Sequence, residues 1–406
     1  MLPLLGLANH KIKLGAIGRE RTWDILDQKV KHSLPKIWVH VASLGEYEQV
    51  VPVLERINRE EYQVILTFFS PSGYENKKDT QLADTVCYLP LDTKVNAAKF
   101  LDLVEPSLAI MVKYEFWPNY LEELKKRDIH TVLVSGIFRE NSVFTKWYGS
   151  WMKDHLQTIN HFFLQNESSR TQLEQLGFTN ATVSGDTRFD RASQLIEQDY
   201  QVTQLDHFTK DSKCLVIGSS WSEDIAIMKQ WLQRNESSKD YKIIIAPHEV
   251  SESSIQSLVN QLEYQPLLWT DIQENKNTTS DSQTLVINTI GLLTKAYSYA
   301  DLAYVGGAMG TKGLHNILEA ATYGVPVIIG KNYEKFPEAG KLEDLGGLFS
   351  VENAQEFESI TNQLLADDYL HDKTGMICGH WINSNTGATR IVLDHLKQMD
   401  ENMVID

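Results

Sequence analysis

Short runs of β-branched and apolar residues alternate along this chain with longer amphipathic stretches, and this rhythm limits the possible folds more than any other feature. Runs of this length and composition are typical of buried parallel strands, and the stretches between them have the spacing of covering helices. In the first half the predicted strands are residues 37–42, 63–68, 108–112, 131–135 and 161–164, with predicted helices at 47–58 and 118–127.

The rhythm stops after residue 190 and starts again at residue 213. The second series of predicted strands covers residues 213–217, 242–246, 285–287, 302–305 and 326–329. A chain of 406 residues is also longer than one ordinary core serves. We therefore expect an α/β protein with two Rossmann-like doubly wound domains facing a central cleft, with ligands bound at the carboxyl ends of the strands.

These patterns divide the chain into five predicted segments. Residues 1–22 are a membrane-proximal segment, residues 23–198 the first domain, and residues 199–212 a polar linker. Residues 213–380 are the second domain. The apolar spacing of Ile391, Val392 and Leu396 predicts a C-terminal helix within residues 381–406 that packs back across the domains.

The net charge of −16 is concentrated in the second half of the chain. Residues 1–190 hold 22 Lys and Arg against 24 Asp and Glu, whereas the remainder holds 16 against 30. Such acidity disfavours nucleic acid as a partner, because phosphate contacts supply most of that affinity. Cys87, Cys214 and Cys378 are far apart and odd in number, so they indicate neither a disulfide framework nor a zinc site.

The N-terminus combines an apolar stretch, residues 1–8, with the basic residues Lys11, Lys13, Arg19 and Arg21. The stretch is too short to span a bilayer and lacks the flanks of a signal peptide. The combination favours shallow attachment to an anionic membrane surface, with a frayed N-terminus as the alternative.

The sequence Ser43-Leu-Gly-Glu46 follows the first predicted strand directly. Gly45 frees the backbone to turn, so Glu46 would lie at the carboxyl end of a strand, where a general base would be placed. The alternative is that Glu46 only complements the dipole of the helix that begins there.

Two further candidates follow strands of the second domain. Small residues at Gly218-Ser219-Ser220 expose backbone N–H groups at a helix start, which suits a phosphate but is also typical of an ordinary helix start. His248, after residues 242–246, is a candidate nucleotide contact or a plain turn residue.

The longest pattern spans residues 304–327, a strand, a glycine loop and a helix predicted to open near His315 and Asn316. Backbone at Gly306 and Gly307 can approach a phosphate closely. Asn316 and Glu319 are three residues apart, so a helix would place both on one face, where an acid can bind the two hydroxyls of a ribose. The pattern is not GxGxxG, which disfavours a nicotinamide site.

These patterns occur in one order, and together they resemble the 3-deoxy-D-manno-octulosonic acid (Kdo) transferases of lipopolysaccharide inner-core synthesis. The resemblance runs from about Lys13 to the tail. It is carried by residues 38–46 (WVHVASLGE), 70–73 (SPSG), 88–92 (YLPLD), 115–119 (EFWPN), 165–167 (QNE), 183–190 (VSGDTRFD) and the glycine loop with residues 315–319 (HNILE).

The resemblance implies a GT-B enzyme that moves Kdo from CMP-Kdo to a lipid A precursor (lipid IVA) with inversion, at the cytoplasmic face of the inner membrane. Glu46 would be the base, and no metal or cofactor is expected. The implied donor-binding residues are Ser219, Ser220, His248, Gly306, Gly307, Asn316 and Glu319. The acceptor-binding candidates are Ser43, Gly45, Glu115, Arg139 and Lys146.

Three departures from the family pattern keep alternatives open. Glu249 follows His248 where the family has a Pro-Arg-His sequence, Lys113 replaces a frequent Glu, and the apolar N-terminal anchor is shorter than in relatives. One alternative is another GT-B enzyme, an epimerase or transferase that uses a UDP-sugar. The other is a catalytically silent protein that binds a membrane surface.

Overall fold

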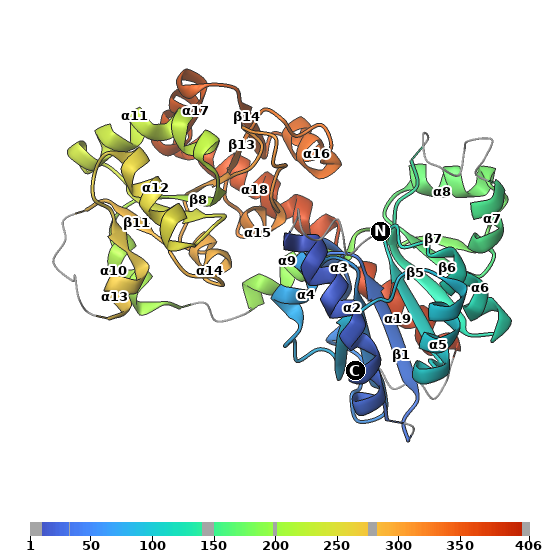
Figure 1. Ribbon diagram of the computed structural model, residues 1–406. Helices are drawn as coiled ribbons and strands as arrows, with labels where there is room; N and C mark the ends of the chain where they lie inside the picture. Colours follow the sequence, from blue (N-terminus) through green and yellow to red (C-terminus); the bar gives the residue numbers. More distant parts are fainter. Residues whose placement is uncertain (1–9, 32, 140–149, 198–200, 275–281, 400–406) are drawn as a thin grey trace. The chain divides into compact units, whose positions relative to one another are not determined.

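The computed structural model describes residues 10–31, 33–139, 150–197, 201–274 and 282–399. They form two compact units (Figure 1). Unit 1 comprises Met1–Arg191 and Asn385–Asp406, and unit 2 comprises Ala192–Ser384.

Unit 1 is a parallel seven-stranded sheet in the order β3-β2-β1-β4-β5-β6-β7. Its strands are β1 (Lys36–Val41), β2 (Gln63–Phe68), β3 (Thr85–Tyr88), β4 (Leu108–Val112), β5 (His130–Gly136), β6 (His161–Leu164) and β7 (Ala181–Val183). Its helices are α2 (His10–Lys29), α3 (Leu44–Leu54), α4 (Pro71–Lys77), α5 (Lys94–Val104), α6 (Pro118–Lys126), α7 (Ser150–Leu156), α8 (Glu167–Gln175), α9 (Thr187–Ser193, which crosses the unit boundary) and α19 (Ala388–Met399).

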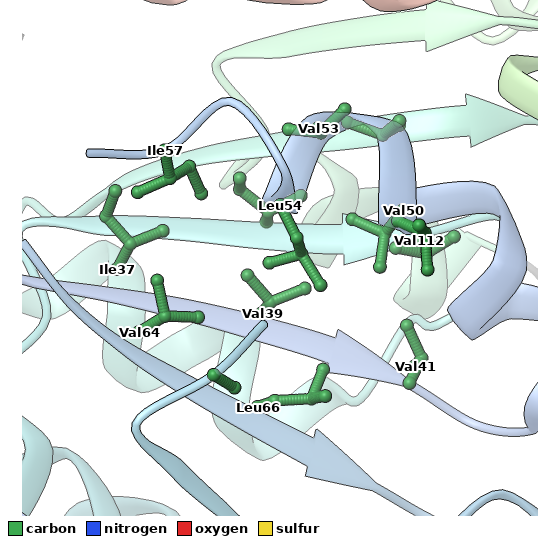
Figure 2. Close-up of a cluster of buried hydrophobic side chains, with 14 of the residues drawn as sticks. Ile37, Val39, Val41, Val50, Val53, Leu54, Ile57, Val64, Leu66 and Val112 are labelled. Atoms are coloured by element: carbon green, nitrogen blue, oxygen red, sulfur yellow. The ribbon is translucent and has the colours of Figure 1, made fainter. Parts of the chain in front are cut away.

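The alternating side chains of β1 explain why helices cover both faces of this sheet. Val39 packs in a cluster with residues of α3 and α19, and part of that cluster is drawn in Figure 2. Trp38 points to the opposite face, where it packs with residues of α2, α5 and α6. Because both faces are buried, every residue of β1 is buried, as expected for a central parallel strand.

Unit 2 repeats this architecture with the strand order β10-β11-β9-β8-β12-β13-β14, again all parallel. Its strands are β8 (Cys214–Ser220), β9 (Lys242–Pro247), β10 (Leu267–Leu268), β11 (Thr284–Val286), β12 (Leu302–Val305), β13 (Val327–Gly330) and β14 (Leu348–Val351). Its helices are η2 (Gln194–Glu197), α10 (Thr203–Thr209), α11 (Ser222–Ser238), α12 (Glu252–Leu262), α13 (Trp269–Gln273), α14 (Leu293–Tyr297), α15 (Leu318–Ala321), α16 (Pro337–Leu345), α17 (Ala354–Ala366) and α18 (Asp368–Ser384).

The N-terminal helix differs from the predicted boundary at residue 22. Helix α2 continues through that point and docks on unit 1: Arg19 donates to the carbonyl oxygens of Leu89 (3.1 Å) and Phe69 (2.6 Å), and Thr22 donates to that of Tyr88 (2.8 Å). The described part of residues 1–22 is therefore integral to unit 1, and residues 1–9 lie outside the described residues.

The other boundaries are also displaced. The chain passes between the units within α9, and residues 203–209 of the predicted linker form α10. The predicted C-terminal helix is α19, and it packs within unit 1, where Val392 and Leu396 join the core beside α3. The chain therefore returns to unit 1 after α18.

All ten predicted strands are present, but four observed strands were not predicted as such. Strands β3, β7 and β10 have only four, three and two residues, and β14 has four. The helix predicted near Asn316 begins later, because residues 316–317 precede the single turn of α15.

Candidate active site

The candidate residues gather where the order of each sheet reverses. In unit 1 the chain leaves β1 to one side and later returns to β4 on its other side, and β8 and β12 have the same relationship in unit 2. Helices that start from adjacent strands diverge at such a point, which leaves the carboxyl ends open to a ligand. Ser43 and Glu115 follow the strands of the first pair. In the second pair Ser220 is the last residue of β8, and Gly306 follows β12.

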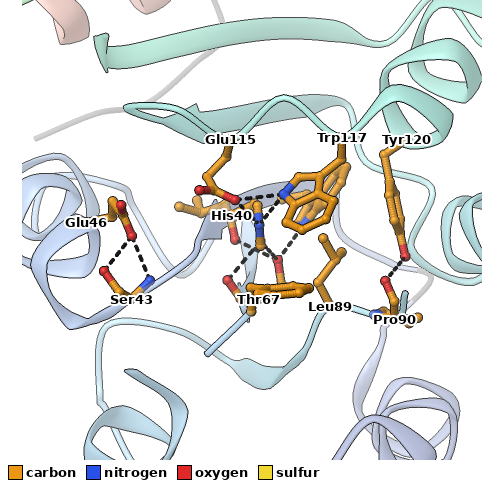
Figure 3. Close-up of polar contacts among 12 residues, drawn as sticks. His40, Ser43, Glu46, Thr67, Leu89, Pro90, Glu115, Trp117 and Tyr120 are labelled. Atoms are coloured by element: carbon orange, nitrogen blue, oxygen red, sulfur yellow. Dashed lines mark hydrogen bonds and ion pairs between the residues drawn. The ribbon is translucent and has the colours of Figure 1, made fainter. Parts of the chain in front are cut away.

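Glu46 lies in the first turn of α3, and Ser43 holds it in place (Figure 3). The backbone N–H of Ser43 donates to Glu46 Oε2 at 2.7 Å, and the Ser43 hydroxyl donates to the same oxygen at 2.6 Å. This is a capping box. The sequence suggested the helix dipole, not a capping box, as the structural role of Glu46. The capping box occupies Oε2, and Oε1 has no hydrogen-bond partner among the described residues.

The SPSG sequence, residues 70–73, packs against the turn at Ser43. Ser70 caps α4, and Gly73 lies in its first turn. A Cβ at Gly73 would come within 3.1 Å of the Ser43 carbonyl carbon and 2.5 Å of the Phe68 ring, so only glycine lets α4 approach the Ser43 turn this closely. Gly45, by contrast, has room for a Cβ and faces solvent.

Glu115 lies in a buried polar cluster beside this turn (Figure 3). Its Oε2 accepts from the Trp117 indole at 2.7 Å and lies 3.2 Å from His40 Nε2. His40, fully buried on β1, reaches the Thr67 hydroxyl with Nδ1 at 2.8 Å. The sequence did not single out His40 or Trp117, although a histidine within a buried strand was a signal that it needed a partner.

Asp92 explains why two distant sequences of the family pattern occur together. Its carboxylate accepts from the backbone N–H groups of Asn119 (3.1 Å) and Tyr120 (3.3 Å), and the Asn119 side chain donates to the Asp92 carbonyl (3.1 Å). The end of the YLPLD sequence thus caps α6, which begins within the EFWPN sequence.

The basic acceptor candidates are only partly placed. Arg139 follows β5 and is exposed beside Tyr114, whose pKa is raised by burial while the nearby Arg139 charge and backbone N–H oppose that rise. Lys146 lies outside the described residues.

In unit 2 the end of β8 has an unusual backbone. Ser219 adopts a left-handed conformation, with φ of +51°, and the Ser220 carbonyl accepts from the backbone N–H of His248 at 3.0 Å. Ser220 is 4% exposed, and its hydroxyl oxygen has no hydrogen-bond partner among the described residues. A buried hydroxyl without a partner at a ligand-binding edge is available to a ligand.

Asp224 joins β8 to the glycine loop and was missed by the sequence analysis. Its Oδ2 accepts from the backbone N–H groups of Trp221 (2.8 Å) and Gly307 (3.0 Å), and its Oδ1 accepts from the Tyr304 hydroxyl (2.9 Å). Burial raises the pKa of Asp224, although the N–H donors oppose this rise. A Cβ at Gly306 would lie 2.5 Å from the Ser219 carbonyl oxygen, so glycine is required where the two loops meet.

His248 belongs to a stack of three rings. Its imidazole stacks on Trp221 and on His315, with ring centres 4.5 Å apart in both cases. The Trp221 indole donates to His315 Nε2 at 3.2 Å. Burial and the neighbouring His248 lower the pKa of His315 to about 4, and burial lowers that of His248, so both rings are neutral at pH 7.

Asn316 and Glu319 are brought together as predicted, although not by a shared helix. The Asn316 amide donates to Glu319 Oε1 at 3.1 Å, and its carbonyl oxygen accepts from the backbone N–H of Leu318. The Thr294 hydroxyl donates to Glu319 Oε2 at 2.8 Å. Thr294, on α14, is a further residue that the sequence analysis missed.

No helix in the described parts of the chain combines the length and apolar character needed to cross a bilayer. Within the same residues, no three His, Cys, Asp or Glu side chains are grouped to hold a metal ion.

Comparison with known families gives a match over residues 16–191, to the family described as 3-deoxy-D-manno-octulosonic-acid transferase. The Haemophilus influenzae protein named 3-deoxy-D-manno-octulosonic acid transferase is 26% identical, over 89% of this chain and 86% of its own length. A bifunctional glycosyltransferase/methyltransferase of Fusobacterium nucleatum is 27% identical over 82% of this chain. This chain spans about half (54%) of that protein.

Solved structures confirm the fold. The UDP-GlcNAc 2-epimerase of Neisseria meningitidis has a TM-score of 0.63 with this chain at 14% identity, covering 89% of this chain and 100% of its own. The chain has two units, each with a parallel doubly wound sheet, and it resembles this epimerase over most of its length. This is the GT-B fold that the sequence predicted. At such low identity the likeness extends to the fold alone.

Proposed function

The chain belongs to the Kdo transferase family, a family of glycosyltransferases, and we propose that it transfers Kdo from CMP-Kdo to a lipid A precursor such as lipid IVA. The proposal rests on family membership together with one structural observation, the Glu46 carboxylate at the carboxyl end of β1. Ser43 fixes one of its oxygens and leaves the other available.

In the proposed reaction Glu46 is the general base. An acceptor hydroxyl oxygen attacks the anomeric carbon of Kdo, and its proton passes to Glu46 Oε1. The bond between that carbon and the phosphate oxygen of CMP breaks, and its electron pair leaves with CMP. A single displacement of this kind inverts the anomeric centre.

Unit 2 would bind the donor. The backbone N–H groups at the start of α11 suit the phosphate of CMP, and the partnerless Ser220 hydroxyl is available to another group of the donor. Glu319, already oriented by Thr294 and Asn316, suits the two ribose hydroxyls, because carboxylate oxygens accept more than one hydrogen bond. No step of the proposed reaction requires a metal ion.

Glu249, the departure from the family pattern beside His248, does not argue against this site. The Ser254 hydroxyl of α12 donates to Glu249 Oε2 at 3.2 Å, so the carboxylate has a partner on α12. Burial keeps the neighbouring His248 neutral at pH 7, so we assign it a stacking or hydrogen-bonding contact rather than a charged one.

The acceptor would reach unit 1 from a membrane surface. Lys13 and Arg21 are exposed on α2, the helix that Arg19 and Thr22 fix to unit 1. We propose that this helix and the residues before it attach the protein to the cytoplasmic face of the inner membrane, where anionic lipids favour basic side chains.

A transfer assay tests the proposal. Purified protein is incubated with a tetraacylated lipid A precursor and CMP-Kdo generated in place, and the product mass is followed. A gain of one or more Kdo units is expected. Parallel binding of CMP and UDP decides between donors: tighter UDP binding without Kdo transfer contradicts the proposal and favours a UDP-sugar enzyme.

A further inference from the structure

A cavity of about 270 Å³ opens in unit 2 between the start of α11 and one side of α12. Ser220 and Trp221 contribute one side of the lining, and Ser257 and Leu258 of α12 contribute another. The remaining lining residues are Ser222, Ile225, Pro247, Glu249, Ser253, Ser254 and Gln261. Glu319, assigned above to the ribose, does not line the cavity, nor do Thr294 and Asn316, which orient Glu319. The cavity is therefore separate from the proposed ribose contacts.

The lining is a surface for neutral hydroxyl groups. Serine hydroxyls supplied by both sides of the lining can each donate and accept, as the hydroxyls of a sugar do. No Lys, Arg or His is among the described lining residues, and Glu249 is, so a phosphate or carboxylate has no cation to pair with there. Trp221, Ile225 and Leu258 add apolar faces for the C–H groups of a sugar ring.

The Ser220 hydroxyl makes this more than a row of serines on a helix. Ser220 is 96% buried, lines the cavity and has no hydrogen-bond partner among the described residues, which is costly without a ligand. Its backbone also lies at the turn where the proposed donor phosphate would sit. A ligand bound at that turn can thus extend into the cavity without leaving the Ser220 backbone.

We infer that this cavity binds the hydroxyl-bearing side of the donor sugar, including its two-carbon exocyclic diol, while the nucleotide occupies the β12 side of the same turn. The inference rests on the proposed function, because it takes the donor to be a CMP-sugar. The carboxylate of Kdo remains outside the cavity, since the lining supplies it no positive charge.

The variant Ser257→Leu fills the cavity from α12 without touching Ser220. Gln256→Leu is the matched control, because Gln256 is exposed on the same helix and does not line the cavity. We expect Ser257→Leu to raise the KM for CMP-Kdo about tenfold or more, as misfit of a few methylene groups does in a binding pocket. The Kd for CMP alone stays within about twofold of the unmodified protein, and Gln256→Leu changes neither value.

An unchanged KM in Ser257→Leu overturns the inference, and so does a loss of CMP affinity that equals the rise in KM, because the cavity would then serve the nucleotide. A second readout does not depend on transfer: free Kdo should shift the indole N–H resonance of Trp221, assigned with Trp221→Phe, and Ser257→Leu should abolish the shift. A shift in protein that transfers no Kdo supports the cavity and rejects the proposed function. Absence of any shift in the unmodified protein overturns the cavity assignment.

Discussion

The carboxylate of Asp190 accepts two hydrogen bonds from Thr389, one from the backbone N–H at 2.7 Å and one from the hydroxyl at 2.7 Å. Asp190 ends the VSGDTRFD sequence, and Thr389 is in the first turn of α19. Asp190, close to the point where the chain leaves unit 1, therefore caps α19, the helix with which the chain returns to unit 1. This contact gives the last residue of the family sequence a structural role.

Replacing Asp190 with Ala should loosen α19. The N–H of Thr389 would be left buried without a partner, at a cost of about 1–3 kcal/mol. Because the protein has two units, amide exchange resolved along the chain is the appropriate measurement, and α19 should lose protection before the strands do. Asp394→Asn, an exposed change on the same helix, is the control. Full protection of α19 in Asp190→Ala contradicts the assignment.

Asp92→Ala should weaken the start of α6. Loss of an acceptor for two N–H groups at a helix start costs about 0.5–2 kcal/mol, and faster amide exchange at Asn119 and Tyr120 should report it. Glu122→Ala, which removes an exposed ion pair with Lys126 on the same helix, should change stability by less than about 0.5 kcal/mol. Equal effects of the two substitutions would argue against the cap.

Two substitutions of Asp224 should have different effects on CMP binding. In Asp224→Asn the amide oxygen can still accept from Trp221 and Gly307, and the Tyr304 hydroxyl can accept from the amide nitrogen, so CMP binding should change little. In Asp224→Ala all three donors lose their acceptor, and CMP affinity should fall at least about tenfold as the two loops separate. Calorimetric titration with CMP measures both. Wild-type affinity in Asp224→Ala would show that the loops hold without it.

His161 makes unit 1 sensitive to mild acid. Burial, with smaller contributions from His395 and His130, lowers its pKa to about 4, against 6.5 for an unperturbed histidine. The unfolded chain therefore binds the proton more readily, so this contribution to stability is complete above about pH 6.5 and is lost as the pH falls towards 4. Thermal unfolding is followed at pH 7 and at pH 5. The difference in Tm between the two pH values should be smaller for His161→Gln than for the unmodified protein. His380→Gln, an exposed change in unit 2, should leave this difference in Tm unchanged. If His161→Gln also leaves it unchanged, His161 is not the source of the pH dependence.

The sequence predicted those parts of the fold in which a local pattern of side chains is enough to specify the secondary structure. Fully buried strands such as β2 and β4 can be recognised in the sequence, because both of their faces require apolar residues. Strand β3 contains Thr85 and Tyr88, and β10 has two residues, so their pairing depends on neighbours that no local pattern reveals. After its return to unit 1, α19 is capped by Asp190, through a hydrogen bond between residues 199 positions apart.

The candidate site shows the same division. Glu46, Ser220 and Glu319 could be found because strand ends and glycine loops mark their places in the chain. His40 and Asp224 were not found, since each matters through partners far away in the sequence: Glu115 and Trp117 for His40, and Gly307 and Tyr304 for Asp224. Hydrogen-bond partners of buried polar groups are set by tertiary structure.

The transfer rate of Glu46→Gln decides whether Glu46 is the base. Glutamine can replace glutamate in a capping box, so the start of α3 should keep its amide protection while the base is lost. We predict a rate reduced about 10²–10⁴-fold, as for loss of a general base, and a smaller loss in Ser43→Ala, which removes one of the two bonds from Ser43 and keeps the carboxylate. A Glu46→Gln protein that transfers Kdo at the unmodified rate would contradict the assignment of Glu46 as the base.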